Sequence, residues 1–152
     1  MIISSVWGSV VHMTNRLREQ IVLANPDIDV RFIDFEAFAN EAELPDSDLI
    51  GPTAFALTET EANFFNVSFA IGVSTYTDDK NLFRMRAIID QVFTRLRPLK
   101  SIPVYKAGTL ELVGQMTVTD GTTLLPMSRA AARPWQYVQL ECLLEPSSKF
   151  EG

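Results

Sequence analysis

The stretch from Phe64 to Pro98 constrains the fold more than any other part of this sequence, because a strand pattern passes directly into a helix pattern. Large apolar residues alternate along its first half: Phe65, Val67, Phe69, Ile71 and Val73. The residues between them are small or polar: Asn66, Ser68, Ala70, Gly72 and Ser74. This period of two predicts a long central strand with one apolar face and a second face that admits a close neighbour.

The second half of the stretch predicts an amphipathic helix that ends at Pro98. Thr77 or Asp78 can cap its start. Arg84 and Arg95 lie largely off the apolar stripe, so we expect their side chains to be free for a partner. The stripe itself recurs at spacings of three and four residues: Leu82, Met85, Ile88 or Ile89, Val92 and Leu96.

The remaining elements are shorter or less regular. A helix is predicted from about Val6 to Leu23, with Ser4 or Ser5 as its cap, and a half-buried strand over residues 27–32. Further strands are predicted at Ile102–Tyr105, Leu110–Val118 and Trp135–Glu145, followed by a frayed tail at 146–152. The 152 residues are enough for one domain with its own core, so residues 1–152 are expected to form a single domain. The element order predicts an α+β fold: a mostly antiparallel sheet with two helices packed on one face.

One segment, Ile33–Ala62, fits neither pattern. It contains Gly51 and two prolines but no lysine or arginine. Eight acids fall within it: Asp34, Glu36, Glu41, Glu43, Asp46, Asp48, Glu59 and Glu61. We therefore expect a long inserted excursion, partly extended, whose middle (Asn40–Thr53) is a mobile acidic loop.

Residues that could carry catalysis are few. The single histidine, His12, lies within the first predicted helix, and the single cysteine, Cys142, lies on the apolar face of the last strand. No Cys/His cluster is present for zinc, and no glycine-rich phosphate loop appears. Asp78–Asp79 and Asp46–Asp48 offer oxygen ligands, but a helix start and a solvated loop explain them better. The sequence predicts no enzyme activity, no cofactor and no bound metal.

Net charge and hydropathy limit the kinds of partner that the chain is expected to bind. The net charge of −6 argues against a protein that wraps nucleic acid through charge. No run approaches the roughly 18 apolar residues that span a bilayer, and the N-terminal segment lacks the charged start of a secretory signal. One cysteine excludes an internal disulfide, which fits a reducing compartment. We expect a soluble, unprocessed protein that does not engage a membrane.

Charge is segregated along the chain. No cation occurs between Arg31 and Lys80, and seven then fall between Lys80 and Lys106. The simpler interpretation is a solvated basic helix face. The alternative is head-to-tail complementarity between copies, which closes a ring if the rotation permits. The candidate interface residues are Glu41, Glu43, Asp46, Asp48, Arg84, Arg95, Arg97, Arg129 and Arg133.

The order of elements, with residues 67–96 and the closing residues 133–145, resembles the tail terminator proteins of long-tailed bacteriophages, the lambda-type minor tail protein family. The resemblance implies a homo-oligomeric ring, a hexamer in that family, at the head-proximal end of the tail. It implies contacts with the tail tube protein and with a head-completion or neck protein, while DNA passes through the lumen. It also implies synthesis in the host cytoplasm and residence in the virion.

Two alternatives to a tail terminator stay open. One is another head–tail connector or tail-completion protein, which also works through its interfaces with other virion proteins. A non-viral soluble α+β binding module differs from both, because it need not assemble into a ring.

Overall fold

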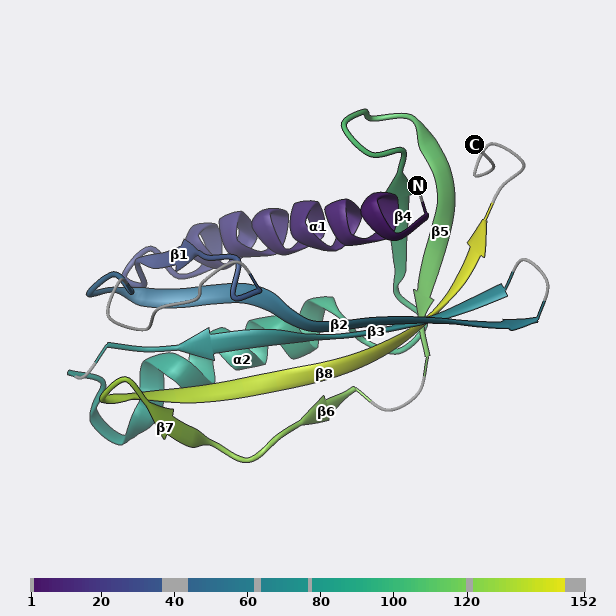
Figure 1. Ribbon diagram of the computed structural model, residues 1–152. Helices are drawn as coiled ribbons and strands as arrows, with labels where there is room; N and C mark the ends of the chain where they lie inside the picture. The colour runs from purple at the N-terminus through teal and green to yellow at the C-terminus, as the bar shows by residue number, and fades with distance from the viewer. Residues whose placement is uncertain (1, 37–43, 62–63, 77, 120–121, 147–152) are drawn as a thin grey trace.

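The computed structural model describes residues 2–36, 44–61, 64–76, 78–119 and 122–146 of the chain. They form an α+β fold of two helices and a curled, mostly antiparallel sheet (Figure 1). The elements are α1 (Ile2–Ala24), β1 (Val30–Phe32), β2 (Asp48–Glu61), β3 (Phe64–Ser74), a 3-10 turn (Lys80–Leu82), α2 (Phe83–Arg95), β4 (Ser101–Tyr105), β5 (Leu112–Val118), β6 (Thr123–Leu124), β7 (Ser128–Ala130) and β8 (Arg133–Pro146).

The sheet is organised around β3 and β8. Its strand order is β1-β2-β3-β8-β5-β4, with β6 and β7 also paired to β8. Strand β1 runs parallel to β2, and the other described pairings are antiparallel. One edge of β8 therefore pairs with β3 while the other pairs with β7, β6 and β5 in succession. The β4–β5 hairpin rises away from the rest of the sheet, and the ends of β2 and β3 project past it (Figure 1).

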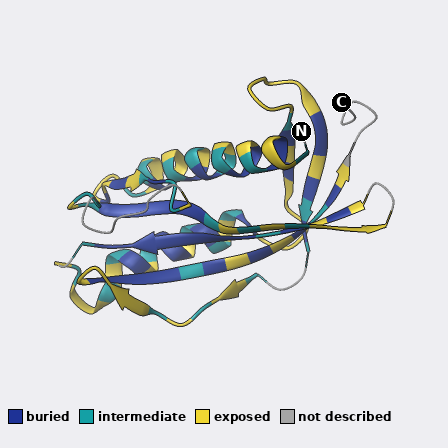
Figure 2. Cartoon of the chain, viewed as in Figure 1, coloured by how far each residue is buried: buried dark blue, intermediate teal, exposed yellow. Residues whose placement is uncertain are grey.

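The apolar face predicted for β3 is confirmed. Phe65, Val67, Phe69, Ile71 and Val73 are all buried and belong to one hydrophobic cluster with both helices. Val138, Leu140, Cys142 and Leu144 join this cluster from the neighbouring β8. Burial follows the inner parts of these strands and gives way to exposed residues at the projecting end of β2 and β3 (Figure 2).

The small face of β3 receives the close neighbour that the sequence predicts. A Cβ atom on Gly72 would lie 2.8 Å from Cε2 of Phe35 and 3.0 Å from Cε1 of Tyr137. The Phe35 ring packs edge-on against Trp135, with ring centroids 5.3 Å apart. Glycine at position 72 thus lets a second aromatic layer lie directly on the strand.

Both predicted helices are present, with shifted bounds. Helix α1 begins at Ile2 rather than Val6, and α2 begins at Phe83 and ends at Arg95. The description of two helices on one face is not confirmed. Helix α1 contacts β1, β2 and β4, whereas α2 contacts β3 and β8. Because the sheet curls, each helix meets a different set of strands.

The predicted acidic loop is wrong for residues 48–53, which begin the long strand β2. Leu49 and Ile50 are fully buried, and both residues pair with β1 on one side and with β3 on the other. Gly51 is needed here, because a Cβ atom would lie 1.7 Å from the carbonyl oxygen of Ile33. Polar and proline neighbours hid this short buried run from a periodicity argument. Residues 40–43 of the expected loop lie outside the described part of the chain.

A tight turn joins β7 to β8. Ala130 pairs with Arg133, so the loop has two residues, and both have positive φ: 54° at Ala131 and 59° at Ala132. That is the backbone of a type I′ hairpin turn, which asparagine and glycine normally occupy. The turn positions Arg133 at the start of β8.

Candidate assembly interface

Two of the candidate interface residues pair with each other inside the chain. Asp48 lies at the start of β2, and its side chain is 6% exposed. Its carboxylate accepts hydrogen bonds from Nε of Arg84 at 2.9 Å and from Nη2 at 3.0 Å. Its Oδ1 also accepts the backbone N–H of Tyr76 at 2.9 Å. Arg84 additionally donates to Asp78 at 2.7 Å. Such a bidentate, charge-assisted pair fixes the orientation of the Arg84 side chain. The expectation from the sequence that Arg84 is free for a partner is therefore wrong.

The hydrogen bonds of Arg84 raise its pKa, with Asp48 as the largest cause, so the guanidinium stays charged. The start of α2 is capped by Asp79 rather than by Asp78. The Asp79 carboxylate accepts the N–H groups of Arg84 and Met85 at 2.9 and 3.0 Å and the hydroxyl of Thr75 at 2.8 Å. Partial burial raises the pKa of Asp79, but these hydrogen bonds outweigh it and the pKa falls below 3.8.

Arg133 is buried, with 4% exposure, and its guanidinium ties three segments together. Nε donates to Oγ of Ser74 at 2.7 Å, and Nη1 donates to the carbonyl of Pro45 at 2.9 Å. Nη2 donates to the carbonyls of Ser47 and Ser74. Burial lowers the pKa of Arg133, because it disfavours the charged form, and the nearby carboxylates of Asp48 and Asp46 oppose this effect. Arg133 therefore has a role inside the fold.

The other candidates are scattered. Asp46 is exposed before β2, Arg129 is exposed in β7, and Arg97 is exposed after α2. Arg95 is half-buried in the last turn of α2. Glu41 and Glu43 lie outside the described residues. Apart from the Asp48–Arg84 pair, two of the nine candidates, Arg95 and Arg97, line a common groove.

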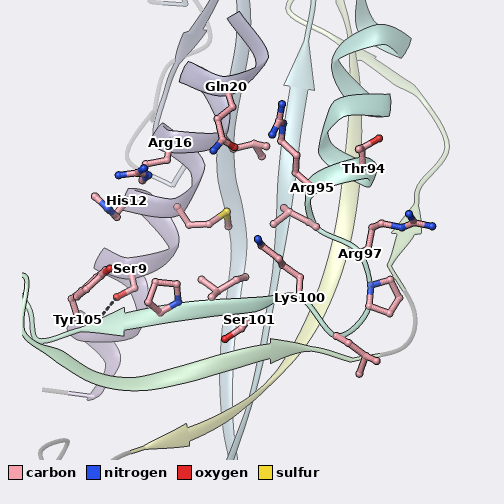
Figure 3. Close-up of a pocket in the computed structure, with 17 residues that line it drawn as sticks. Ser9, His12, Arg16, Gln20, Thr94, Arg95, Arg97, Lys100, Ser101 and Tyr105 are labelled. Carbon is pink, nitrogen blue, oxygen red and sulfur yellow. Dashed lines mark hydrogen bonds between the residues drawn. The ribbon is translucent and has the colours of Figure 1, made fainter. Parts of the chain in front are cut away.

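That site is a groove of about 790 Å³ between the middle of α1, the C-terminal end of α2 and β4 (Figure 3). Four cations line it: Arg16, Arg95, Arg97 and Lys100, with His12 nearby. The lining that the structure describes contains no carboxylate. Arg95 and Lys100 extend into the space between the helices, whereas Arg97 points away from it (Figure 3). We call this site the basic groove; its floor includes the apolar residues Met13, Leu17, Leu96 and Ile102.

Arg95, which lines the basic groove, also contains a buried and unsatisfied donor. Its Nε atom is buried and has no hydrogen-bond partner among the described groups. A buried N–H without an acceptor costs about 1–3 kcal/mol. The basic groove thus presents excess positive charge, which favours an anionic, oxygen-rich occupant.

Negative charge gathers at a different place. Glu59 and Glu61 are exposed at the end of β2, where Glu61 pairs with Phe64 at the start of β3. Phe64 is itself 41% exposed. We call Glu59, Glu61 and Phe64 the hairpin end. Sequence reasoning placed these acids in the excursion and did not select them for the interface, because it did not recognise β2 as a strand.

Of the residues considered for catalysis, Cys142 is buried in the core and His12 lies at the surface. His12 is exposed and meets the edge of the Tyr105 ring, with centroids 5.8 Å apart. Burial raises the pKa of the Cys142 thiol to about 12. No group of three metal-ligating side chains occurs within the described ranges. None of the helices described in the structure has the length and hydropathy of a membrane span.

No protein-family model matches this chain, and no curated protein matches it at significant similarity.

Proposed function

We propose that this chain is a structural subunit that assembles head to tail into a ring, and that the ring is the terminator of a bacteriophage tail. The observation that carries the assembly is the separation of a carboxylate-free basic groove from an exposed acidic hairpin end on the same chain. Two different, complementary surfaces on one subunit favour a heterologous contact, which generates a closed ring when the rotation between neighbours is a simple fraction of a turn.

The biological assignment extends the resemblance in the sequence. The ring, a hexamer in that family, sits on the last layer of tail tube protein, stops tube growth and offers its other side to a head-completion or neck protein. DNA passes through its lumen, and the subunit is made in the host cytoplasm and resides in the virion. The work is mechanical and uses interfaces, so it needs no catalytic residue and no cofactor.

The packing supports a subunit of fixed shape. Asp48, Arg84 and Arg133 join the starts of β2, α2 and β8, and one continuous core links both helices to the sheet. A rigid subunit holds the angle to its neighbour constant, which is what separates a closed ring from an open filament.

Light scattering on the purified chain, followed by electron microscopy of tail tubes polymerised with and without it, tests the proposal. We expect a discrete species of about six copies and tubes that stop growing when it is added. A ring that never associates with tubes would contradict the terminator assignment and leave a different connector. A monomer at all concentrations would instead favour a binding module.

A further inference from the structure

We propose that the basic groove is the socket for the hairpin end of the next subunit, with Glu59 and Glu61 on the groove cations and Phe64 on its apolar floor. This inference rests on the proposed ring, because it names the two surfaces that meet. It differs from the pairing expected from sequence, in which Arg84 and Arg133 took part.

The described lining of the groove contains cations but no carboxylate, whereas the hairpin end carries two carboxylates. The Arg95 and Lys100 side chains extend into the space between the helices, where that lining offers them no carboxylate partner (Figure 3). Carboxylates are the strongest protein acceptors for guanidinium and ammonium groups. Glu59 and Glu61 are exposed, and no described cation forms an ion pair with either.

The hairpin end cannot reach the groove of its own subunit. Trp7 packs on Phe55 with ring centroids 5.2 Å apart, whereas Arg18 donates to Val30, whose strand pairs with Asp48–Ile50. Helix α1 therefore runs antiparallel to β2. Arg16 lies about 14 Å along α1 from Trp7, at 1.5 Å per residue. Glu61 lies about 20 Å from Phe55 in the opposite direction, at 3.3 Å per residue.

Shape and polarity also agree. The groove volume of about 790 Å³ is that of a site for a few side chains rather than a folded element. The groove floor is apolar at Met13, Leu17 and Leu96, and its rim is cationic. The hairpin end carries one carboxylate on each face, because Glu61 pairs with the exposed Phe64 while Glu59 pairs with Phe65 across a register shift. An apolar contact surrounded by charge pairs is the usual arrangement of a specific interface.

Charge reversal on either side tests the pairing. We would measure the concentration of half-assembly by analytical ultracentrifugation for Glu59→Lys with Glu61→Lys, and for Arg95→Glu with Lys100→Glu. Loss of an exposed ion pair changes an equilibrium constant by up to about fivefold, and reversal adds repulsion, so each double reversal should raise this concentration about tenfold. The chain that carries all four substitutions should recover assembly, because its charges are again complementary.

Matched controls reverse equal charge elsewhere. Asp27→Lys with Asp29→Lys alters two exposed acids two residues apart, and Arg31→Glu with Arg86→Glu alters two exposed cations outside the groove. Both should assemble within about twofold of the unmodified chain. Should far-ultraviolet circular dichroism show that the Arg95 variant misfolds, Arg16→Glu with Lys100→Glu, both exposed and both lining the groove, takes its place.

The outcomes separate this inference from the proposed function. Rings that form equally well with reversed hairpin and groove charges would overturn the socket while leaving the ring intact. Loss of assembly that the fourfold exchange does not restore would also overturn it. A monomeric unmodified chain would overturn both.

Discussion

Replacing Arg133 with alanine should destabilise the fold rather than the assembly. The guanidinium donates to Oγ and the carbonyl of Ser74, which are buried, and to the carbonyls of Pro45 and Ser47, which are partly buried. Its centre also lies 5.9 Å from the ring centroid of Trp135. Removal leaves the Ser74 acceptors without this donor, whereas water can reach the other two carbonyls.

The magnitude follows from these contacts. Each buried acceptor left unsatisfied costs about 1–3 kcal/mol. Loss of the cation–π contact adds about 0.5–1 kcal/mol. Relief from burying a cation opposes both, because burial already lowers the pKa of Arg133. We expect the free energy of unfolding to fall by about 2–4 kcal/mol.

Urea unfolding followed by circular dichroism, at one protein concentration and in about 0.5 M salt to weaken assembly, measures this loss. Arg129→Ala is the matched control: its side chain is exposed in β7, so its effect should stay within about 0.5 kcal/mol. A stability loss below about 0.5 kcal/mol for Arg133→Ala, together with weakened assembly, would refute this reasoning. Arg133 would then be assigned to the interface between subunits.

Three further changes probe other parts of the fold. Phe69→Ala, at a side chain 1% exposed, should cost about 3–5 kcal/mol in urea unfolding, and a loss under about 1 kcal/mol would contradict its place in the core. Ala132→Gly should raise stability by about 0.5–1 kcal/mol, because it relieves the left-handed backbone of the β7–β8 turn, and an unchanged or lower urea midpoint would contradict this strain. The lowered pKa of Asp79 means that its stabilisation is complete above the unfolded pKa of about 3.9 and is lost as pH falls through the folded value. The urea midpoint of the unmodified chain should therefore fall more steeply between about pH 5 and 3 than that of Asp79→Asn, and parallel curves would contradict the capping role.

The sequence predicted elements wherever one period dominated. The β3 alternation and the α2 stripe each extend over several repeats, so Phe69 and Ile88 were placed in the core correctly. Strand β2 was missed because it is buried on both faces at Leu49–Ile50, which removes the alternation. The β7–β8 turn was missed because Ala131–Ala132 carries none of the usual turn residues.

Polar residues on buried faces were the second source of error. Ser5 was expected to cap α1 but lies inside it, where its Oγ accepts the N–H of Ala107 at 3.1 Å. Ser9 Oγ likewise accepts the N–H of Tyr105 at 2.9 Å. Both join α1 to segments about a hundred residues away, and local spacing carries no information about such contacts. The same limit explains why Asp48 and Arg84 were assigned to an interface instead of to each other.

The most direct test of head-to-tail assembly mixes two variants that each fail alone. The Glu59→Lys with Glu61→Lys variant has a basic hairpin end and an unchanged groove. The Arg95→Glu with Lys100→Glu variant has two carboxylates in place of the two cations that extend into the groove, and an unchanged hairpin end. Each chain repels its own kind, but every contact in an alternating ring is complementary. Native mass spectrometry of the equimolar mixture should reveal rings with equal numbers of both chains. At a concentration where the unmodified chain forms rings and one that assembles about tenfold more weakly does not, rings formed by either variant alone, or a mixture that stays monomeric, would contradict the account.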